Sequence, residues 1–585
     1  MKFKSLKVQN FRNFKSINLD LSNKNVIFGM NDTGKTNLLH AIRFLLDRDV
    51  RKKGFSQSDY YKNDVTQDIE IILEISLSDR KDNTPESEDS KYLISKVKNA
   101  RNNDDNLDQF FIKLTAAYDE QELYGNPVMS WGDCLEKLIP IPGKGEVYDL
   151  DKIFKVVYLE PLVDLDNNFK RYKRILFNQE KKSENDVKIE NEIESNIRKM
   201  NEGISNLDVV KTVQNKLTDG YRTFKKENLN IELKSQIMID GYLDNLIPYV
   251  KWDEDDKNYY PTGGDGRKKI LSYAITNYAI ECVYNSQIVI YLIEEPENSL
   301  HRSMQISLSQ QLFNQEIYKY FFLTTHSAEI LYEMDETQLI RISNKNQKNS
   351  HSYLYRVPKE YKNAKKKLNK GLSNALFYEK VLLVEGGSEY VLFEAVLSYI
   401  APDYEQQGSY LMQVDGINFK PYIDLFKELG IKWIVKTDND LKAKRGHPHH
   451  FDLIGMNRCL QLLGEDKMEY IRIDYDASLP KKEKEILLEQ KLYESKKDIY
   501  SKNTDLIKRF NENMIFLSEV DLETDLFNAI PDDLKKMTDE EDPVSWLQSS
   551  KLLNMVELVG LLNEEIANRV YESIPALKEL INYGA

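Results

Sequence analysis

The amino-acid sequence predicts an α/β protein with two α/β domains, the first of which contains a helical insertion. Three observations lead to this prediction. A strand, a glycine loop and a helix follow one another near the N-terminus; apolar residues then repeat at helical spacing; and apolar strands ending in acidic residues return in the last third of the chain. We place the first domain at residues 1–345 with its insertion at about 165–245, a basic linker at 346–374 and the second domain at 375–585.

Composition narrows the class of protein. A length of 585 residues allows several domains, and 41% hydrophobic and 30% charged residues are ordinary for a soluble globular chain. The net charge of −14 argues against nucleic-acid binding by bulk attraction, although a local basic patch or a bound metal ion can still contact phosphates. The first residues lack a signal-peptide core and no apolar run could span a bilayer, so we expect a soluble protein without membrane contact.

Cysteine usage indicates the cellular compartment in which the protein is expected. Cys134, Cys282 and Cys459 lie far apart and form no CxxC pair, which excludes a zinc knuckle and a disulfide framework. We therefore expect a protein of the reducing cytoplasm.

The N-terminal elements are read from their apolar patterns. The stretch "KFKSLKVQNF" alternates as a half-buried strand does, "NVIFG" is typical of a buried strand, and "TNLLHAIRFLLD" has helical apolar spacing. The polar stretch "LSDRKDNTPESEDSK", from Leu77, predicts a surface loop.

A phosphate-binding loop lies between this buried strand and this helix. "GMNDTGKT" (Gly29–Thr36) matches G-x-x-x-x-G-K-[ST] in the strand-to-helix context that the motif requires. Backbone N–H groups and the helix N-terminus can surround phosphate oxygens, the lysine can reach the β- and γ-phosphates, and the threonine can bind Mg²⁺. We expect the nucleotide to contact Gly29, Asn31, Gly34, Lys35 and Thr36.

Three further stretches strengthen the prediction of a nucleotide site. "IVIYLIEEPENSLH" is an apolar strand that ends in Glu294 and Glu295, of which one can hold Mg²⁺ and the next can orient the attacking water. "FFLTTHS" ends at His326, where the imidazole could contact a γ-phosphate, and "PTGGDGRKK", from Pro261, opens a helix with glycines. The order of these pieces is more specific than any one of them.

In that order, the motifs resemble ATP-binding-cassette-type ATPases, particularly the branch that includes RecF and SMC proteins, and "FRNF" (Phe11–Phe14) resembles that branch too. The resemblance implies a dimer in which two heads enclose ATP. The sequence departs from the family at Glu294, where the first Walker B acid is usually Asp. The longer side chain can shift the metal, so slow ATP hydrolysis is expected.

The insertion has apolar residues on one helical face, with Lys, Glu and Asn between them. This pattern predicts an amphipathic helix or a coiled-coil hairpin, and either a helix packed on its own domain or a dimerisation arm explains it equally well. The residues that set the pattern are Ile189, Ile193, Ile197, Met200, Ile204 and Leu207.

In the second domain, three apolar strands end in acidic residues. "VLLVEGGSE" ends in Glu385, with Glu389 four residues on; "WIVKTDND" ends in Asp438 and Asp440; and "MIFLSEVDLETD" contains Glu519 and Asp521. If the strands are parallel, their carboxyl ends share one edge of the sheet. Residues at i and i+2 of an extended strand point the same way, so each acid pair could face one ion.

Such a group of carboxylates requires cations. Oxygen ligands favour Mg²⁺ or Mn²⁺ over zinc, and two such ions can support phosphodiester cleavage. A cationic side chain such as Lys551 could hold the scissile phosphate. Glu389 could instead be only a first-turn helix acid, and "GHPHH" (from Gly446) favours an exposed turn near the substrate over a metal site.

This second constellation resembles the Toprim domain, and an ATPase head followed by Toprim resembles the OLD (overcoming lysogenization defect) nuclease family along essentially the whole chain, in particular its Gabija antiphage branch. The resemblance implies a dimerisation role for the insertion, a tetramer built from dimers, and a UvrD-like helicase partner. It also implies a catalytic lysine at Lys551 and metal ligands at Glu385, Asp438, Asp440, Glu519 and Asp521, with Glu389 a less certain ligand.

The resemblance implies a Mg²⁺-dependent endonuclease of double-stranded DNA in bacterial antiphage defence, which high nucleotide holds inactive. Candidate DNA contacts are Lys442, Lys444 and Arg445, and Lys365–Lys367, although these lysines could equally be ordinary solvated side chains. Two alternatives remain at this stage: a SMC- or RecF-like repair ATPase or clamp with a non-catalytic Toprim module, and a Toprim enzyme that acts on RNA.

Overall fold

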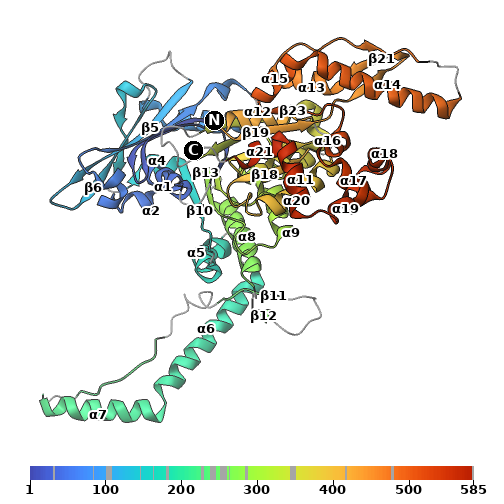
Figure 1. The fold of residues 1–585 in the computed structure, drawn as a ribbon. Coiled ribbons are helices and arrows are strands. Elements are labelled where there is room, and N and C mark those ends of the chain that lie inside the picture. The colour runs from blue at the N-terminus through green and yellow to red at the C-terminus, as the bar shows by residue number, and fades with distance from the viewer. Residues whose placement is uncertain are drawn as a thin grey trace. The chain divides into compact units, whose positions relative to one another are not determined.

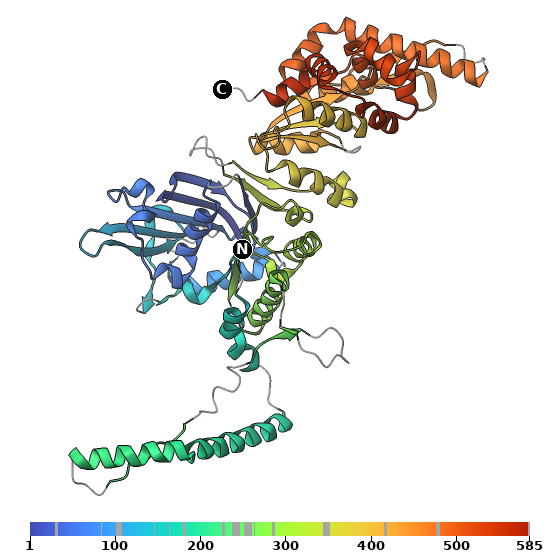
Figure 2. The same cartoon turned by 60° about the horizontal axis from the view of Figure 1, so that its bottom comes forward.

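The chain forms two compact units, which we describe separately (Figures 1 and 2). The larger contains Met1–Tyr158, Ile290–Glu297 and Arg302–Ala585, and the smaller Leu159–Val289 and Asn298–His301. The computed structural model describes residues 1–29, 33–82, 85–100, 108–144, 147–162, 164–178, 183–224, 229–236, 246–250, 260–261, 264–283, 287–342, 351–414, 418–475 and 480–582.

The larger unit begins with an antiparallel six-stranded sheet in the order β2-β1-β4-β5-β6-β7. The alternation predicted at the N-terminus is confirmed, because every second residue over much of β1 is buried. The strands are β1 (Lys2–Phe11), β2 (Phe14–Asp20), β4 (Ile69–Ser76), β5 (Gln109–Asp119), β6 (Tyr124–Gly132) and β7 (Ile139–Pro140).

A second six-stranded sheet, in the order β10-β13-β14-β3-β15-β16, carries the P-loop. Its inner strands β13, β14, β3 and β15 pair in parallel and are almost continuously buried, which explains their unbroken apolar runs. Helix α1 (Lys35–Leu46) follows β3 as predicted. The strands are β3 (Lys24–Phe28), β10 (Phe154–Leu159), β13 (Ile288–Glu294), β14 (Phe321–Thr324), β15 (Thr337–Arg341) and β16 (His351–Tyr355).

Two stretches of this unit differ from their sequence appearance. The stretch from Leu77, predicted as a loop, contains a 3-10 turn (Ser78–Lys81) and α3 (Pro85–Lys96). Asp79 is the physical reason: it is buried and accepts hydrogen bonds of 2.6 Å from both the N-terminal ammonium and Ser90 Oγ, which ties these polar residues to the first strand. Strand β16 lies inside the stretch assigned to the linker, where it pairs with β15.

The second predicted α/β region has a parallel four-stranded sheet in the order β18-β17-β19-β23. Apolar residues of β17 and of helices α11, α16, α19 and α20 form one core on a face of this sheet, while α10 packs on β18 and α12 on β19. The strands are β17 (Lys380–Val384), β18 (Ser409–Gln413), β19 (Lys432–Thr437) and β23 (Ile515–Leu517). The helices are α10 (Lys365–Ala375), α11 (Gly387–Ile400), α12 (Lys420–Glu428), α16 (Leu522–Ala529), α19 (Lys551–Val559), α20 (Glu564–Ser573) and α21 (Pro575–Ile581).

Between β19 and β23 the chain forms a small antiparallel sheet and three helices. The "GHPHH" stretch, predicted as an exposed turn, only begins at the turn between β20 (Leu441–Lys444) and β21 (His447–Leu453). Its histidines belong to β21, where His447 is exposed but His449 and His450 are half-buried because β21 pairs with its neighbours in the small sheet. The remaining elements are β22 (Ile471–Arg472), α13 (Ile454–Leu463), α14 (Lys481–Lys502) and α15 (Thr504–Glu512).

In the smaller unit, α5 (Leu165–Asn178) packs against α8 (Asp265–Val283). Helices α6 (Glu184–Ser205) and α7 (Asp208–Phe224) follow one another along an arm and do not fold back as a hairpin (Figures 1 and 2). Residues 229–236 run back beside them, since Ile231 N donates to Thr218 Oγ1 and Ser235 N to Ser205 Oγ. The prediction of amphipathic helices is thus confirmed. No helix in the described part of the chain has the length and apolarity needed to cross a membrane.

Candidate functional site

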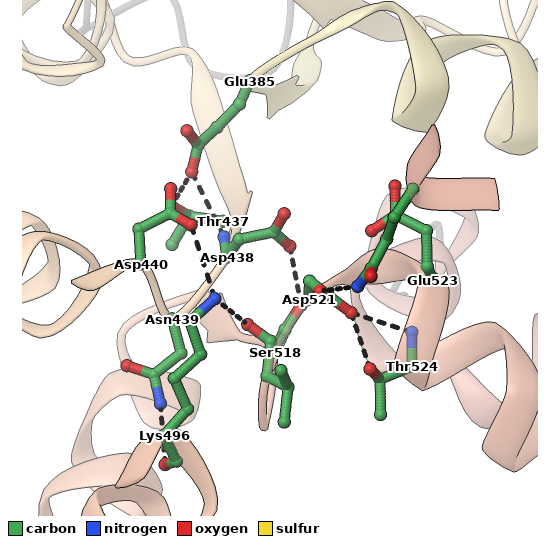
Figure 3. A network of polar contacts seen from close by, with 12 residues as sticks. Glu385, Thr437, Asp438, Asn439, Asp440, Lys496, Ser518, Asp521, Glu523 and Thr524 are labelled. Atoms are coloured by element: carbon green, nitrogen blue, oxygen red, sulfur yellow. Dashed lines mark hydrogen bonds and ion pairs between the residues drawn. The ribbon is translucent and has the colours of Figure 1, made fainter. Parts of the chain in front are cut away.

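The acidic residues of the second α/β region follow parallel neighbouring strands. Glu385 comes directly after β17 and Asp438 directly after β19, and Asp521 lies four residues beyond the end of β23. Because β17, β19 and β23 pair in parallel, these residues lie at one edge of the sheet, which we call the acidic edge (Figure 3). The parallel arrangement that the sequence suggested is confirmed.

Glu385 is held by residues of the neighbouring strand and of α13. Its Oε1 accepts hydrogen bonds from the Thr437 hydroxyl, from the backbone N of Asp438 at 3.2 Å, and from Arg458, with which it also forms an ion pair. The Arg458 guanidinium contacts the Thr437 hydroxyl as well. Glu385 therefore points toward β19 and not outward into solvent (Figure 3).

Asp438 is the most enclosed of the predicted ligands. It is 8% exposed, and its Oδ1 accepts a hydrogen bond of 3.1 Å from Ser518 Oγ. Burial, and next the nearby charge of Glu389, raise the pKa of Asp438 well above its usual range, although the Lys436 ammonium opposes this shift. Negative charge is thus concentrated around this buried carboxyl group.

Asp440 differs from Asp438 in its surroundings. Its side chain is 47% exposed, and Oδ1 lies 3.7 Å from Lys496 Nζ of α14. Between the two, Asn439 is fully buried and donates from Nδ2 to the backbone oxygens of Lys496 and Glu519. The shared orientation expected from i, i+2 spacing applies to a strand, whereas β19 ends at Thr437; a common ion for Asp438 and Asp440 stays a prediction.

Asp521 caps helix α16. Its Oδ1 accepts from the backbone N of Thr524 at 2.9 Å and from the Thr524 hydroxyl at 2.7 Å, while Oδ2 accepts from Gln548 Nε2 at 2.8 Å (Figure 3). The capping explains why an acid stands at this position, and it holds the carboxylate at the acidic edge.

Lys551 reaches the acidic edge from the start of α19. Its Nζ lies 3.4 Å from both carboxylate oxygens of Glu523, which is 1% exposed. Burial acts to lower the pKa of Lys551, but the charges of Glu523, Asp438 and Asp521 outweigh it and raise that pKa. The predicted catalytic lysine is therefore a half-exposed cation that pairs with Glu523, an acid outside the predicted ligand set, and that feels the charges of the predicted ligands Asp438 and Asp521.

Glu389 and Glu519 occupy different positions. Glu389, in the first turn of α11, is 8% exposed and close enough to Asp438 to raise its pKa. Glu519 instead lines a cavity of about 320 Å³ with Lys436, Tyr500 and Asp525. Within the described ranges, no contact joins the Glu519 side chain to Asp438 or Asp521, so its role as a ligand stays a prediction.

The P-loop follows β3 at the carboxyl ends of the parallel inner strands of the second six-stranded sheet. Lys35 Nζ donates to the Gly29 oxygen at 3.0 Å, and Thr36 Oγ1 donates to Glu294 Oε1 at 2.5 Å. The other oxygen of Glu294 accepts a hydrogen bond from the Tyr158 hydroxyl. Glu294, which stands where the family usually has Asp, thus contacts Thr36, the residue predicted to bind Mg²⁺, directly. Asn31 lies outside the described residues.

The neighbouring acid and histidine face each other. His326 Nε2 lies 3.7 Å from Glu295 Oε1, and burial together with the charge of Lys35 lowers the pKa of His326. The histidine is oriented by Glu297, whose Oε1 accepts from His326 N at 2.5 Å. Glu295 adopts a left-handed backbone conformation with φ of 41°. Sequence reasoning missed Glu297, although it stands in the same acidic stretch.

Residues of the "FRNF" stretch contact the P-loop and the start of α1 through hydrogen bonds. A Cβ on Gly34, where φ is 105°, would lie 2.2 Å from Asn13 Nδ2, which itself donates to Thr33 O at 2.9 Å. Asn13 Oδ1 accepts from Asn37 Nδ2 at 2.8 Å, and Asn37 Oδ1 accepts from Arg12. Arg12 and Asn13 therefore shape the loop and the start of α1.

Comparisons with known proteins match both domains of the chain. A family model described as "Overcoming lysogenization defect protein-like, TOPRIM domain" matches residues 376–440, and an AAA ATPase domain model matches residues 1–128 and 160–331. The chain is 49% identical over 583 residues, 99% of each chain, to Endonuclease GajA of Bacillus cereus (strain VD045). The chain belongs to the GajA endonuclease family. This member has an α/β fold with an ATPase head followed by a Toprim domain.

More distant similarities are also found. A second Endonuclease GajA, from Bacillus cereus (strain HuB5-5), is 23% identical over 265 residues, which are 39% of this chain and 38% of that relative. Among solved structures, an SMC head bound to the C-terminal winged-helix domain of ScpA is 13% identical with a TM-score of 0.31, and covers 60% of this chain and 97% of that one. A TM-score this low does not establish a shared fold.

The donor chemistry of the acidic edge in this GajA-family protein fits divalent metal ions. The side chains are carboxylates, and the buried Asn439 Oδ1 accepts no hydrogen bond from the described residues. In the conformation seen, no three described His, Cys, Asp or Glu side chains are placed to hold an ion together. In this conformation Glu385 and Asp521 are hydrogen-bonded to protein groups.

Two basic residues of this GajA-family protein were missed from the sequence. Lys436 is fully buried next to the acidic edge, where it donates to the Ser518 hydroxyl and to Asp525 Oδ2 at 2.7 Å. A lysine inside the apolar strand "WIVKTD" is a signal that could have identified it. Arg458 lies 73 residues after its partner Glu385, in a helix with no motif, so no local pattern marks it.

Proposed function

We propose that this protein is a divalent-metal-dependent DNA endonuclease of bacterial antiphage defence, whose activity responds to nucleotide bound at the P-loop. The observation that carries the proposal is the acidic edge: acids that follow three parallel strands lie along it with Lys551, and Asp438 is buried with other carboxylates nearby. Membership of the GajA family supports a nuclease, and it does not favour the alternative of a repair clamp.

Glu385, Asp438 and Asp521 would hold the ions, with Glu389, Asp440 and Glu519 as further candidates. Bound Mg²⁺ or Mn²⁺, as two ions, would supply an activated water molecule and stabilisation of the leaving oxygen. Lys551 would bind a non-bridging oxygen of the scissile phosphate, because its ammonium is kept charged by the carboxylates around it. Because the pKa of Asp438 is raised by burial and by nearby carboxylates, cations bound beside it would favour its ionised form, so the site would assemble fully only when loaded.

The P-loop would hold ATP through Lys35 and Thr36. Thr36 and Glu294 would share the Mg²⁺ of the nucleotide, and Glu295 and His326 would lie at the γ-phosphate. The direct bond between Thr36 and Glu294 supports slow hydrolysis, since the longer acid occupies space next to the threonine. Nucleotide binding, rather than rapid turnover, would then regulate cutting.

A homodimer through the arm is part of the proposal. No residue of α6 among those described is buried, and its apolar residues continue onto α7. Covering such a face with a second copy would remove apolar surface from water. The exposed residues are Val187, Ile189, Met200, Ile204, Leu207, Val209, Val213 and Leu217. A tetramer built from dimers, a cytoplasmic location and a UvrD-like helicase partner extend the proposal by resemblance.

Nicking of supercoiled plasmid with Mg²⁺ tests the nuclease. We expect the wild type to convert the plasmid to nicked or linear forms and Glu385→Ala to lose this activity. Glu540→Ala, which removes an exposed carboxylate of the same region, is the matched control. Equal cutting by the wild type and Glu385→Ala would reject the acidic edge as the active site, and parallel digestion of RNA would reveal an RNA enzyme.

Nicking across millimolar ATP tests the regulation. We expect ATP to slow the wild type, and Lys35→Ala to cut at the same rate with and without ATP because it loses the phosphate contact. A wild type whose cutting is equal at all ATP concentrations would remove the nucleotide response from the proposal.

A further inference from the structure

Arg341 is a buried arginine of the sheet that carries the P-loop, and its side chain contacts residues at the starts of two strands of the four-stranded sheet. It is the last residue of β15 and is 6% exposed. Its Nη1 donates to the backbone oxygens of Leu429 at 3.3 Å and Gly430 at 3.0 Å, and its Nη2 donates to Tyr378 O at 3.2 Å. Nη2 also lies 3.1 Å from Glu379 Oε1. One guanidinium group therefore contacts four acceptors of the Toprim region, which belong to two pairs of adjacent residues.

These acceptors lie at the starts of two strands that carry acids at their other ends. Tyr378 and Glu379 directly precede β17, and Leu429 and Gly430 form the turn before β19. β17 leads into Glu385, and β19 leads into Asp438. The two strands pair in parallel with Lys380 opposite Lys432, so their starts are adjacent as well as their ends. A movement of Arg341 would act on both strands together.

On its other side, Arg341 adjoins the P-loop. β15 pairs with β3, and Ile342, the next residue after Arg341, donates from its N to Phe28 O at 3.0 Å. A Cβ on Gly29 would lie 2.4 Å from Ile342 O, so the first residue of the P-loop rests directly on this backbone. The Phe28 ring also meets Phe377 edge-on, with 6.3 Å between centroids.

We propose that Arg341 is the positioning residue that couples nucleotide occupancy of the P-loop to the placement of Glu385 and Asp438. The proposal rests on the nuclease and the nucleotide response proposed above. A nucleotide that shifts Gly29 shifts Ile342 and with it the guanidinium group, and the paired strands carry the shift to the acidic edge. Arginine suits this role because its planar, forked donors bind several acceptors in one geometry, which lysine cannot do.

The test compares Arg341→Lys with Arg356→Lys. The first keeps the charge but loses the fork, and the second alters an exposed arginine that directly follows the neighbouring strand β16. We measure plasmid nicking with and without ATP, binding of a fluorescent ATP analogue, and amide hydrogen exchange in peptides covering residues 378–384 and 431–437. Thermal unfolding verifies that each variant is folded, and Arg341→Gln replaces Arg341→Lys if the latter is not.

We expect the ratio of nicking rates without and with ATP to fall about fivefold or more in Arg341→Lys, the lower range of allosteric couplings. Analogue binding should change less than about twofold, and Arg356→Lys should match the wild type. The same variant should also lose the ATP-induced change in hydrogen exchange at both peptides. If Arg341 only stabilises the fold, Arg341→Lys will lower the unfolding temperature but leave the ratio of nicking rates without and with ATP unchanged. That result would overturn the proposal.

The experiment distinguishes failure of the proposed nucleotide response from failure of the coupling through Arg341. If wild-type nicking does not respond to ATP, the nucleotide response proposed above is wrong, and hydrogen exchange then decides the role of Arg341 alone. An ATP-induced change at the two peptides that is present in the wild type and absent in Arg341→Lys supports the coupling. No change in the wild type, or the same change in both proteins, overturns it.

Discussion

Arg458 and Glu385 form an ion pair at the end of β17, and both side chains also contact the Thr437 hydroxyl. The negative charge of Glu385, the first acid of the acidic edge, is thereby neutralised by the Arg458 guanidinium of α13. A divalent ion that binds Glu385 has to compete with this guanidinium group. The pair therefore bears on how much metal the proposed nuclease requires.

Replacing Arg458 by Met removes the competing cation and keeps an apolar stem. We expect the Mg²⁺ concentration for half-maximal nicking to fall about tenfold, since a hydrogen bond to a charged group contributes about 1.5–3 kcal/mol. A metal titration of plasmid nicking measures this value. Arg472→Met, which breaks an exposed ion pair with Asp474, is the control. A requirement that stays the same or rises would show that Arg458 does not compete with the ion.

Replacing Lys551 by Met removes the only cation that contacts Glu523 in the described structure. We expect nicking to slow by about 10²–10³-fold, the usual effect of losing a group that stabilises charge in the transition state. Single-turnover nicking measures the rate, and Lys536→Met on exposed helix surface serves as control. A rate within a few-fold of the wild type would exclude a catalytic role for Lys551.

The hairpin of β20 and β21 presents Lys442, Lys444 and Arg445 to solvent. If each binds a phosphate, replacing all three by Gln lowers the slope of log affinity against log salt by about 0.9 per contact. Fluorescence anisotropy of labelled duplex DNA in EDTA measures binding without cutting. Lys481→Gln with Lys482→Gln, on the exposed start of α14, is the matched control. An unchanged slope would place the DNA elsewhere.

His40, on α1 behind the P-loop, predicts a pH dependence of stability. Burial, and next the charges of Arg12 and Arg43, lower the pKa of His40 to about 4 from 6.5. Between these values the unfolded chain binds a proton that the folded protein does not, so the stability contributed by neutral His40 is present above pH 6.5 and is lost as the pH falls toward 4. We expect the wild-type unfolding temperature to drop more than that of His40→Gln between pH 7 and pH 5. Equal drops in calorimetry would contradict this sign.

The backbone of the nucleotide site could be predicted from local sequence, but its supporting contacts could not. A strand, a glycine turn and a helix are contiguous from Asn25 to Leu46, so their backbone geometry follows from neighbouring residues alone. The support of Gly34 by Asn13 does not follow in this way. It requires β1, β2 and β3 to bring the turn at Asn13 next to the loop.

The positions of the acids at the acidic edge could also be predicted, whereas a polar stretch elsewhere was predicted wrongly. Apolar strands ending in acids predicted that Glu385, Asp438 and Asp521 share one edge, because parallel pairing is expected where strands and helices alternate. The order of the strands came only from the structure. The polar stretch from Leu77 misled the same reasoning, since its burial depends on a bond between Asp79 and the chain's own N-terminus.

By itself, the sequence determined the two α/β regions, the P-loop and the set of strand-end acids, because each depends on residues adjacent in the chain. Only the tertiary structure decided what surrounds them: Arg458 on Glu385, Lys436 beside Asp438, Glu519 facing a separate cavity, and Arg341 joining the sheets. These partners come from segments that are remote in the chain or from side-chain directions after a strand has ended. Such contacts arise only when the packing of helices on sheets has selected which side chains meet.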